Sequence, residues 1–222
     1  MHFAPKSAMP PRTRSILAGL TSLALLGAIG ATFWYQDLQY SLPTPRPAAW
    51  KPVPTGTRIA LPPDIEAVRR KNPGKPLLLH FFNPSCPCSR FNLDHVRQLV
   101  NTFGHDVVFV AVLREEAPDT LTRAYRALGL EIPFHVDPGP LAEATGIYST
   151  PQAAVLDADG RLFYQGNYNL TRYCRDRETE FARLALERLR IGAPAPQFAA
   201  EAGVAYGCPL PARTRSASKG DL

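Results

Sequence analysis

The chain has 222 residues, of which 45% are apolar and 20% charged, with 23 prolines, four cysteines and a formal net charge of +6. This length allows one ordinary domain plus further segments, and the apolar content excludes a wholly disordered chain. Four cysteines are too few for a small domain built on disulfides. The positive charge is concentrated at the two ends, in 1–14 and 212–222. A nucleic-acid-binding protein would carry it on its folded body, so we expect no nucleic acid partner.

An uncharged apolar segment runs from Ile16 to Trp34. As a helix it would be about 28 Å long, which suits a hydrocarbon core of about 30 Å. Basic residues precede it and aromatic residues follow it, so the positive-inside rule predicts a cytoplasmic N-terminus at 1–14 and a transmembrane anchor at 15–35. A cleaved signal peptide is the alternative, because the segment contains small residues typical of a cleavage site. Both interpretations export the rest of the chain. In a bacterium, the anchor makes this a single-pass inner-membrane protein with its C-terminal domain in the periplasm.

Residues 36–63 are rich in proline and show neither a helical nor a strand period. Such a composition favours extended polyproline II and predicts a semi-rigid linker that acts as a spacer. The folded domain is expected over 64–192. A second proline-rich segment, 193–222, is expected to form a C-terminal tail that carries Cys208.

The domain is expected to alternate strands and helices, because continuous apolar runs alternate with segments of helical spacing. The expected strands are 77–82, 107–113, 132–136, 153–156 and 161–165, and the expected helices are 93–103, 119–129, 141–145 and 178–191. Strand–helix–strand units imply parallel pairing, and the last two strands form a hairpin. The predicted fold class is therefore α/β, with one mixed sheet flanked by helices.

Two cysteines, Cys86 and Cys88, lie between the first strand and its helix. The start of a helix favours the thiolate, which is the nucleophile of disulfide exchange, and Arg90 adds a nearby cation. The placement of this pair therefore predicts redox chemistry.

The cysteine pair after a strand, together with Ser149-Thr150-Pro151 before a hairpin, resembles the thioredoxin superfamily, and its membrane-anchored redoxin or TlpA-like branch in particular. The stretch TPQAAVLDADGRLFYQG is similar to that family, and bacterial membrane-anchored members of unknown role share a Cys-Pro-Cys site and a Tyr-Gly-Cys tail. The resemblance implies a thiol–disulfide oxidoreductase that acts on protein partners without a bound cofactor. It also implies that Pro151 is cis and faces the cysteines, with Thr150 before it.

The chain departs from the family pattern at the cysteines, which are Cys-x-Cys rather than Cys-x-x-Cys. If Cys86 takes the first position, Ser89 stands at the resolving position, and His80 replaces a buried carboxylate of the family. If Cys88 takes the resolving position, Ser85 replaces the nucleophile. We prefer the first alignment, in which Cys86 exchanges with a substrate disulfide and Cys88 resolves it. His80 is then a candidate proton acceptor, and a plain core histidine is the alternative.

The other two cysteines, Cys174 and Cys208, flank the last helix. We expect them to form a structural disulfide that ties the tail to the domain. The alternative is that one of them resolves the disulfide of Cys86.

Two other function classes stay open. A soft-metal module for an ion such as Cu(I) would use Cys86 and Cys88 with His80 or His135. A thiol peroxidase is disfavoured, because Asn83 stands where that family keeps a hydroxyl residue.

Overall fold

The computed structural model describes residues 10–36, 38, 42–114, 118–171, 174 and 176–210. Its contacts divide the chain into two units, 1–42 and 43–222. In the first unit, α1 (Pro11–Gln36) buries no residue and has a mean hydropathy of 1.9 in its most apolar window. Within the described part of the chain, it is the one helix long and apolar enough to cross a membrane. An anchor and a signal sequence both fit this helix.

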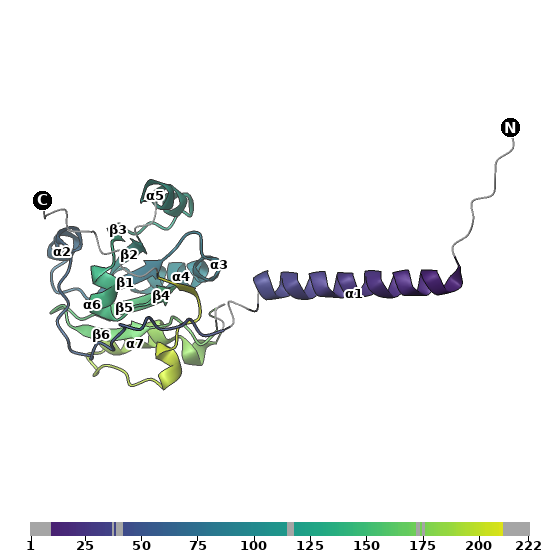
Figure 1. Cartoon of the computed structure of the whole chain (residues 1–222). Helices are drawn as coiled ribbons and strands as arrows, with labels where there is room; N and C mark the ends of the chain where they lie inside the picture. The colour runs from purple at the N-terminus through teal and green to yellow at the C-terminus, as the bar shows by residue number, and fades with distance from the viewer. Residues whose placement is uncertain are drawn as a thin grey trace, which may run out of the picture. The chain divides into compact units, whose positions relative to one another are not determined.

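The second unit is built around a mixed β-sheet. Among its described residues, five strands are hydrogen-bonded in the order β3-β2-β1-β5-β6. Their bounds are β1 (Leu77–Phe82), β2 (Val108–Arg114), β3 (Phe134–Asp137), β5 (Gln152–Leu156) and β6 (Leu162–Gly166). The first three strands are parallel, and β5 runs antiparallel to both β1 and β6. Figure 1 shows the sheet between its helices, and this confirms the predicted thioredoxin-like α/β architecture.

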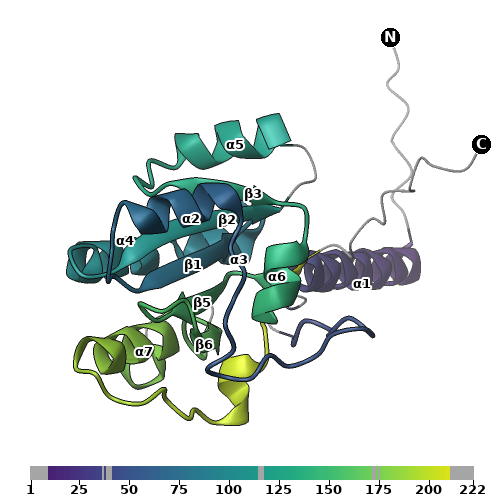
Figure 2. The same cartoon turned by 90° about the vertical axis from the view of Figure 1, so that its left-hand side faces the viewer.

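Helices cover both faces of the sheet (Figure 2). They are α2 (Pro63–Arg70), α3 (Pro87–Phe91), α4 (Leu93–Phe103), α5 (Pro118–Ala127), α6 (Pro140–Thr145) and α7 (Phe181–Arg190). Side chains of β1 alternate between the two faces. Leu78 and Phe82 belong to the core that contains α4 and α7, whereas Leu79 packs with Ile65 of α2 and Leu141 of α6.

A small second sheet was not predicted. It pairs β4 (Ser149–Thr150) with β7 (Cys208–Pro209), which belongs to the proline-rich tail. The tail also contains the short helix η3 (Ala200–Gly203). It therefore folds back over the domain and reaches the loop in front of β5.

The proline-rich segment before the domain also differs from a free spacer. From Pro43 on it belongs to the same unit as the sheet. Trp50 Nε1 donates a hydrogen bond to the carbonyl oxygen of Gly146 at 2.8 Å, and the Trp50 ring contacts Tyr148 edge to face. An extended chain can lie on a surface and bond to it through its non-proline residues without forming regular structure. Figures 1 and 2 show this segment passing beside the tail.

Candidate active site

Cys86 directly follows the turn at the end of β1. Asn83 Oδ1 accepts a hydrogen bond from Ser85 N at 2.9 Å, and the Asn83 carbonyl accepts one from Cys86 N at 3.0 Å. This turn makes Cys86 the residue that precedes α3, and Pro87 takes the first helical position, where its missing N–H costs nothing. The predicted placement of the cysteines between the first strand and a helix is confirmed.

The disulfide of the site joins Cys86 to Cys208, 122 residues apart in the sequence, with their Cα atoms 6.2 Å apart. The expected structural disulfide between Cys174 and Cys208 is therefore wrong, and the alternative, in which Cys208 is the partner of Cys86, is the one that the structure contains. The physical reason lies in the tail, which pairs with β4 and so brings Cys208 to the start of α3. Cys174 instead directs its Sγ to Asn92 Oδ1 at 3.0 Å.

The expected pair of Cys86 with Cys88 is likewise not the bonded one. Cys88 is a thiol inside α3 and is completely buried. Cys86 is only 1% exposed, although the preferred alignment assigns it the exchange with a substrate disulfide. The tail explains this difference, because its cysteine is bonded to the Cys86 sulfur.

The two-residue pairing of β4 with β7 fixes the tail at the site. Thr150 is opposite Cys208, and Ser149 Oγ donates to the Cys208 carbonyl at 3.0 Å. The backbone N–H of Leu210 donates to the Tyr148 carbonyl at 2.9 Å. A Cβ atom at Gly207 would overlap the Thr150 carbonyl oxygen. Glycine therefore permits the close approach of the two segments.

Thr150, the residue before the expected cis-proline, lies at the disulfide. The Thr150–Pro151 peptide bond is cis, as predicted. Cys86 Sγ is 3.7 Å from the Thr150 carbonyl oxygen. Thr150 thus contacts the Cys86 sulfur through its carbonyl oxygen, and it lies opposite Cys208 in the pairing of β4 with β7.

His80 lies on β1, fully buried, on the face of the sheet covered by α4 and α7. Its Nδ1 is 2.7 Å from the Tyr168 hydroxyl, and Nε2 has no hydrogen-bond partner among the described residues. Burial lowers the pKa of His80 to about 3, with a smaller contribution from His95. At neutral pH the imidazole is uncharged and weakly basic, which favours a core histidine over a proton acceptor.

A buried polar cluster surrounds Tyr168, whose ring contacts both His80 and His95. Burial raises the pKa of Tyr168 well above its usual value and lowers that of His95. It also raises the pKa of Cys174 to about 12, and nearby Glu180 adds to this effect. Cys174 therefore remains a protonated thiol at neutral pH and is a poor nucleophile.

Of the remaining predicted residues, Arg90 stays near Cys86, whose carbonyl oxygen accepts a hydrogen bond from the Arg90 backbone N–H at 3.2 Å. Arg90 is exposed in the last turn of α3. His135 lies on β3, where its Nδ1 is 2.7 Å from Asp64 Oδ2. Among the described residues, no group of three or more His, Cys, Asp or Glu side chains is placed to hold a metal ion.

Polar residues that sequence reasoning missed hold the tail in place. The Tyr148 hydroxyl accepts from Ala205 N at 2.9 Å, and Asn167 Nδ2 donates to the Val204 carbonyl at 2.5 Å. Thr44 Oγ1 donates to the Gly207 carbonyl at 2.9 Å and accepts from Gly207 N at 3.0 Å. The glycine beside Cys208 is the one local signal in the sequence for such a close approach.

A family model described as "Domain of unknown function (DUF6436)" matches residues 59–209. The chain belongs to this family. The matched part of this DUF6436 protein contains Cys86, Cys88, Cys174 and Cys208, so both halves of the disulfide lie inside the family's domain. No curated protein matches the chain.

The DUF6436 protein is similar in fold to solved structures of low sequence identity. A hypothetical protein, SMc02350 from Sinorhizobium meliloti 1021, is 20% identical with a TM-score of 0.59, covering 72% of this chain and 96% of that one. An uncharacterized conserved protein from Geobacillus kaustophilus is 21% identical with a TM-score of 0.57, covering 75% and 97%. MTB dsbF is 18% identical with a TM-score of 0.44, covering 54% and 84%. Other similar structures are described as thioredoxin-like or as thiol-disulfide oxidoreductases.

Proposed function

We propose that this DUF6436 protein is a thiol–disulfide oxidoreductase whose redox-active pair is Cys86 and Cys208. The observation that carries the proposal is the disulfide itself, which lies between the start of α3 and the cis-proline loop of a thioredoxin-like sheet.

The reaction is an exchange of one disulfide for another. A thiolate of the reduced pair attacks a disulfide of a partner protein, forms a mixed disulfide and releases one partner thiol. The second cysteine of the pair then attacks the mixed disulfide, which closes the Cys86–Cys208 bond and releases the second partner thiol. Two electrons pass to the partner, and a dithiol reductant returns the pair to its reduced form. The reverse sequence oxidises a partner dithiol.

The proposed location is outside the cytoplasm, on a membrane. α1 serves as a single-pass anchor, and the domain exchanges disulfides with protein partners in the bacterial periplasm. This compartment permits a disulfide to persist, whereas cytosolic thiol systems would keep it reduced. The length and hydropathy of α1 support the anchor.

The test equilibrates the full-length chain in detergent with mixtures of reduced and oxidised glutathione, followed by alkylation and mass mapping. We expect the Cys86–Cys208 bond to open and close reversibly. We also expect the reduced chain to accelerate insulin disulfide reduction by a dithiol, an activity that Cys86→Ser and Cys208→Ser lose at least tenfold.

Cys174→Ser and Cys88→Ser are the matched controls, and both should retain most of the activity. If Cys208→Ser retains full activity and Cys88→Ser loses it, the redox pair is Cys86 with Cys88 instead. If neither the unchanged chain nor any of these variants accelerates insulin reduction, the proposal is wrong.

A further inference from the structure

The two cysteines of the disulfide differ in their exposure to solvent. Cys86 is 1% exposed, enclosed by the start of α3 and the Thr150 carbonyl. Cys208 is half-buried, and Pro209 after it is exposed. Disulfide exchange requires the incoming thiolate to approach one sulfur roughly in line with the S–S bond, on the side opposite the leaving sulfur. Cys86 offers almost no exposed surface for such an approach, whereas part of Cys208 is exposed.

The tail is anchored independently of the disulfide, so Cys208 stays at this surface. Thr44 bonds both backbone groups of Gly207, and its own N–H donates to the Ala205 carbonyl at 2.7 Å. Further upstream, Asn167 N–H donates to the Ala202 carbonyl at 2.9 Å. These contacts do not involve either sulfur. Opening of the disulfide therefore leaves Cys208 positioned between Cys86 and the solvent.

We infer that Cys208, in the tail, is the sulfur that exchanges with partner thiols, and that Cys86 acts behind it as the resolving cysteine. This inference rests on the proposed function and reverses the order expected from the sequence, in which Cys86 meets the substrate. A partner thiolate attacks Cys208 Sγ, and the Cys86–Cys208 bond breaks with its electron pair on Cys86. Cys86 takes up a proton from water. The resulting thiol donates to the Thr150 carbonyl oxygen, a contact that the structure already provides.

By microscopic reversibility, the two cysteines keep these roles when the pair is itself oxidised and the partner disulfide is reduced. Cys208 of the reduced chain attacks the partner disulfide, and Cys86 then attacks Cys208 Sγ in the mixed disulfide. The partner is released as a thiol, and the Cys86–Cys208 bond closes. The partner thus contacts the tail, which presents an extended segment at Cys208–Pro209.

The experiment exposes the oxidised full-length chain in detergent to reduced glutathione for short times. Acid then stops the exchange, N-ethylmaleimide blocks the thiols, and mass mapping locates both adducts. We expect the species with glutathione on Cys208 and N-ethylmaleimide on Cys86 to predominate. It should be at least tenfold more abundant than the species with glutathione on Cys86 and N-ethylmaleimide on Cys208. The Cys88→Ser variant is mapped in parallel, and it should give the same result because Cys88 has no part in this step.

Glutathione found mainly on Cys86, or in equal amounts on both residues, would overturn the inference and leave the proposed function standing. A disulfide that glutathione never opens would overturn both. A second measurement uses reduced single variants with oxidised glutathione. Cys86→Ser, which retains Cys208, should form the mixed disulfide at least tenfold faster than Cys208→Ser, and the opposite order contradicts the inference.

Discussion

Thr44 is the residue through which the segment before the domain contacts the redox-active tail. It is 6% exposed, and its hydroxyl satisfies both the N–H and the carbonyl of Gly207, next to Cys208. A buried backbone group that loses its partner costs about 1–3 kcal/mol. This hydroxyl therefore adds to the β4–β7 pairing in holding Cys208 in position.

The first prediction concerns this hydroxyl. Thr44→Val keeps the shape of the side chain but leaves both groups of Gly207 without their partner. We expect the oxidised full-length chain to lose about 1–2 kcal/mol of unfolding free energy in urea. We also expect the Cys86–Cys208 bond to become easier to reduce, because the loosened tail no longer holds Cys208 near Cys86.

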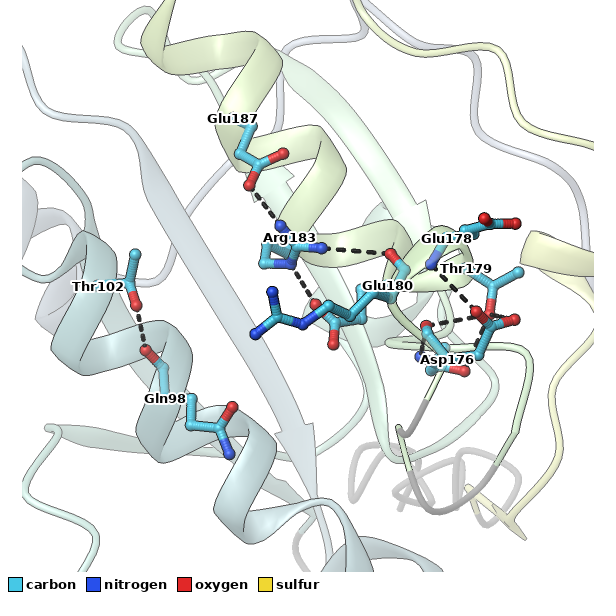
Figure 3. Close-up of polar contacts among 10 residues, drawn as sticks. Gln98, Thr102, Asp176, Glu178, Thr179, Glu180, Arg183 and Glu187 are labelled. Carbon is cyan, nitrogen blue, oxygen red and sulfur yellow. Dashed lines mark hydrogen bonds and ion pairs between the residues drawn. The ribbon is translucent and has the colours of Figure 1, made fainter.

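Thr102→Val is the matched control, because Thr102 Oγ1 donates to the Gln98 carbonyl on the exposed side of α4 (Figure 3). This change should stay within about 0.5 kcal/mol of the unchanged chain. Thr44→Ser should restore the lost stability. Equal effects of the two valine variants would contradict the role given to Thr44.

At the scale of elements, the start of α7 depends on a charged group of three residues. Arg183 lies between Glu180 and Glu187, with Nη1 2.5 Å from Glu187 Oε1 and Nε bonded to Glu180 (Figure 3). The hydrogen bond with Glu180 raises the pKa of Arg183 above its usual value. The Glu180 side chain is 11% exposed, whereas the Glu187 side chain is 37% exposed. The two pairs should therefore differ in strength.

The second prediction compares these two carboxylates. Glu180→Gln removes the charge from the buried pair, and we expect a loss of about 1–2 kcal/mol of unfolding free energy. Glu187→Gln removes the solvated pair, and solvent screening keeps its effect below about 0.5 kcal/mol. Urea unfolding at low and high salt measures both. Equal losses for the two variants would show that burial does not decide the strength of these pairs.

The sequence predicts the elements of the sheet well and the pairing of the tail poorly. Apolar runs such as 77–82 and the turn residues before β6 are local signals, because burial and turn geometry act on neighbouring residues. The pairing of Cys208 with Cys86 depends on a two-residue strand, on Thr44 and on Asn167, which lie far apart in the sequence. No local period encodes such contacts. The position of Cys86 before a helix was therefore predictable, whereas its bond to Cys208 could be named only as an alternative.

At the scale of the whole molecule, folding encloses two histidines in their uncharged form. Burial lowers the pKa of His80 to about 3 and also lowers that of His95. In the unfolded chain these residues titrate near about 6.5. Between pH 3 and about 6.5, His80 therefore binds more protons in the unfolded state than in the folded state. Stability is therefore greatest above about pH 6.5 and is lost as the pH falls toward 3.

The third prediction tests this dependence on His80. His80→Asn keeps a polar atom near the Tyr168 hydroxyl but cannot take up a proton in this range. We expect the slope of unfolding free energy against pH, between pH 3 and 6.5, to fall by up to about 1.4 kcal/mol per pH unit. His105→Asn, at a side chain that is 97% exposed, should leave the slope unchanged. An unchanged slope in His80→Asn would mean that His80 is already protonated in the folded chain.

The separation of 122 residues between Cys86 and Cys208 also sets an order in time. At about 5–20 residues per second, a ribosome adds Cys208 roughly 6–25 s after Cys86. Throughout this interval Cys86 has been made and its partner has not. The Cys86–Cys208 bond can therefore close only after Cys208 has been synthesised. A chain that stops before Cys208 contains Cys86 without the cysteine to which it is bonded in the structure.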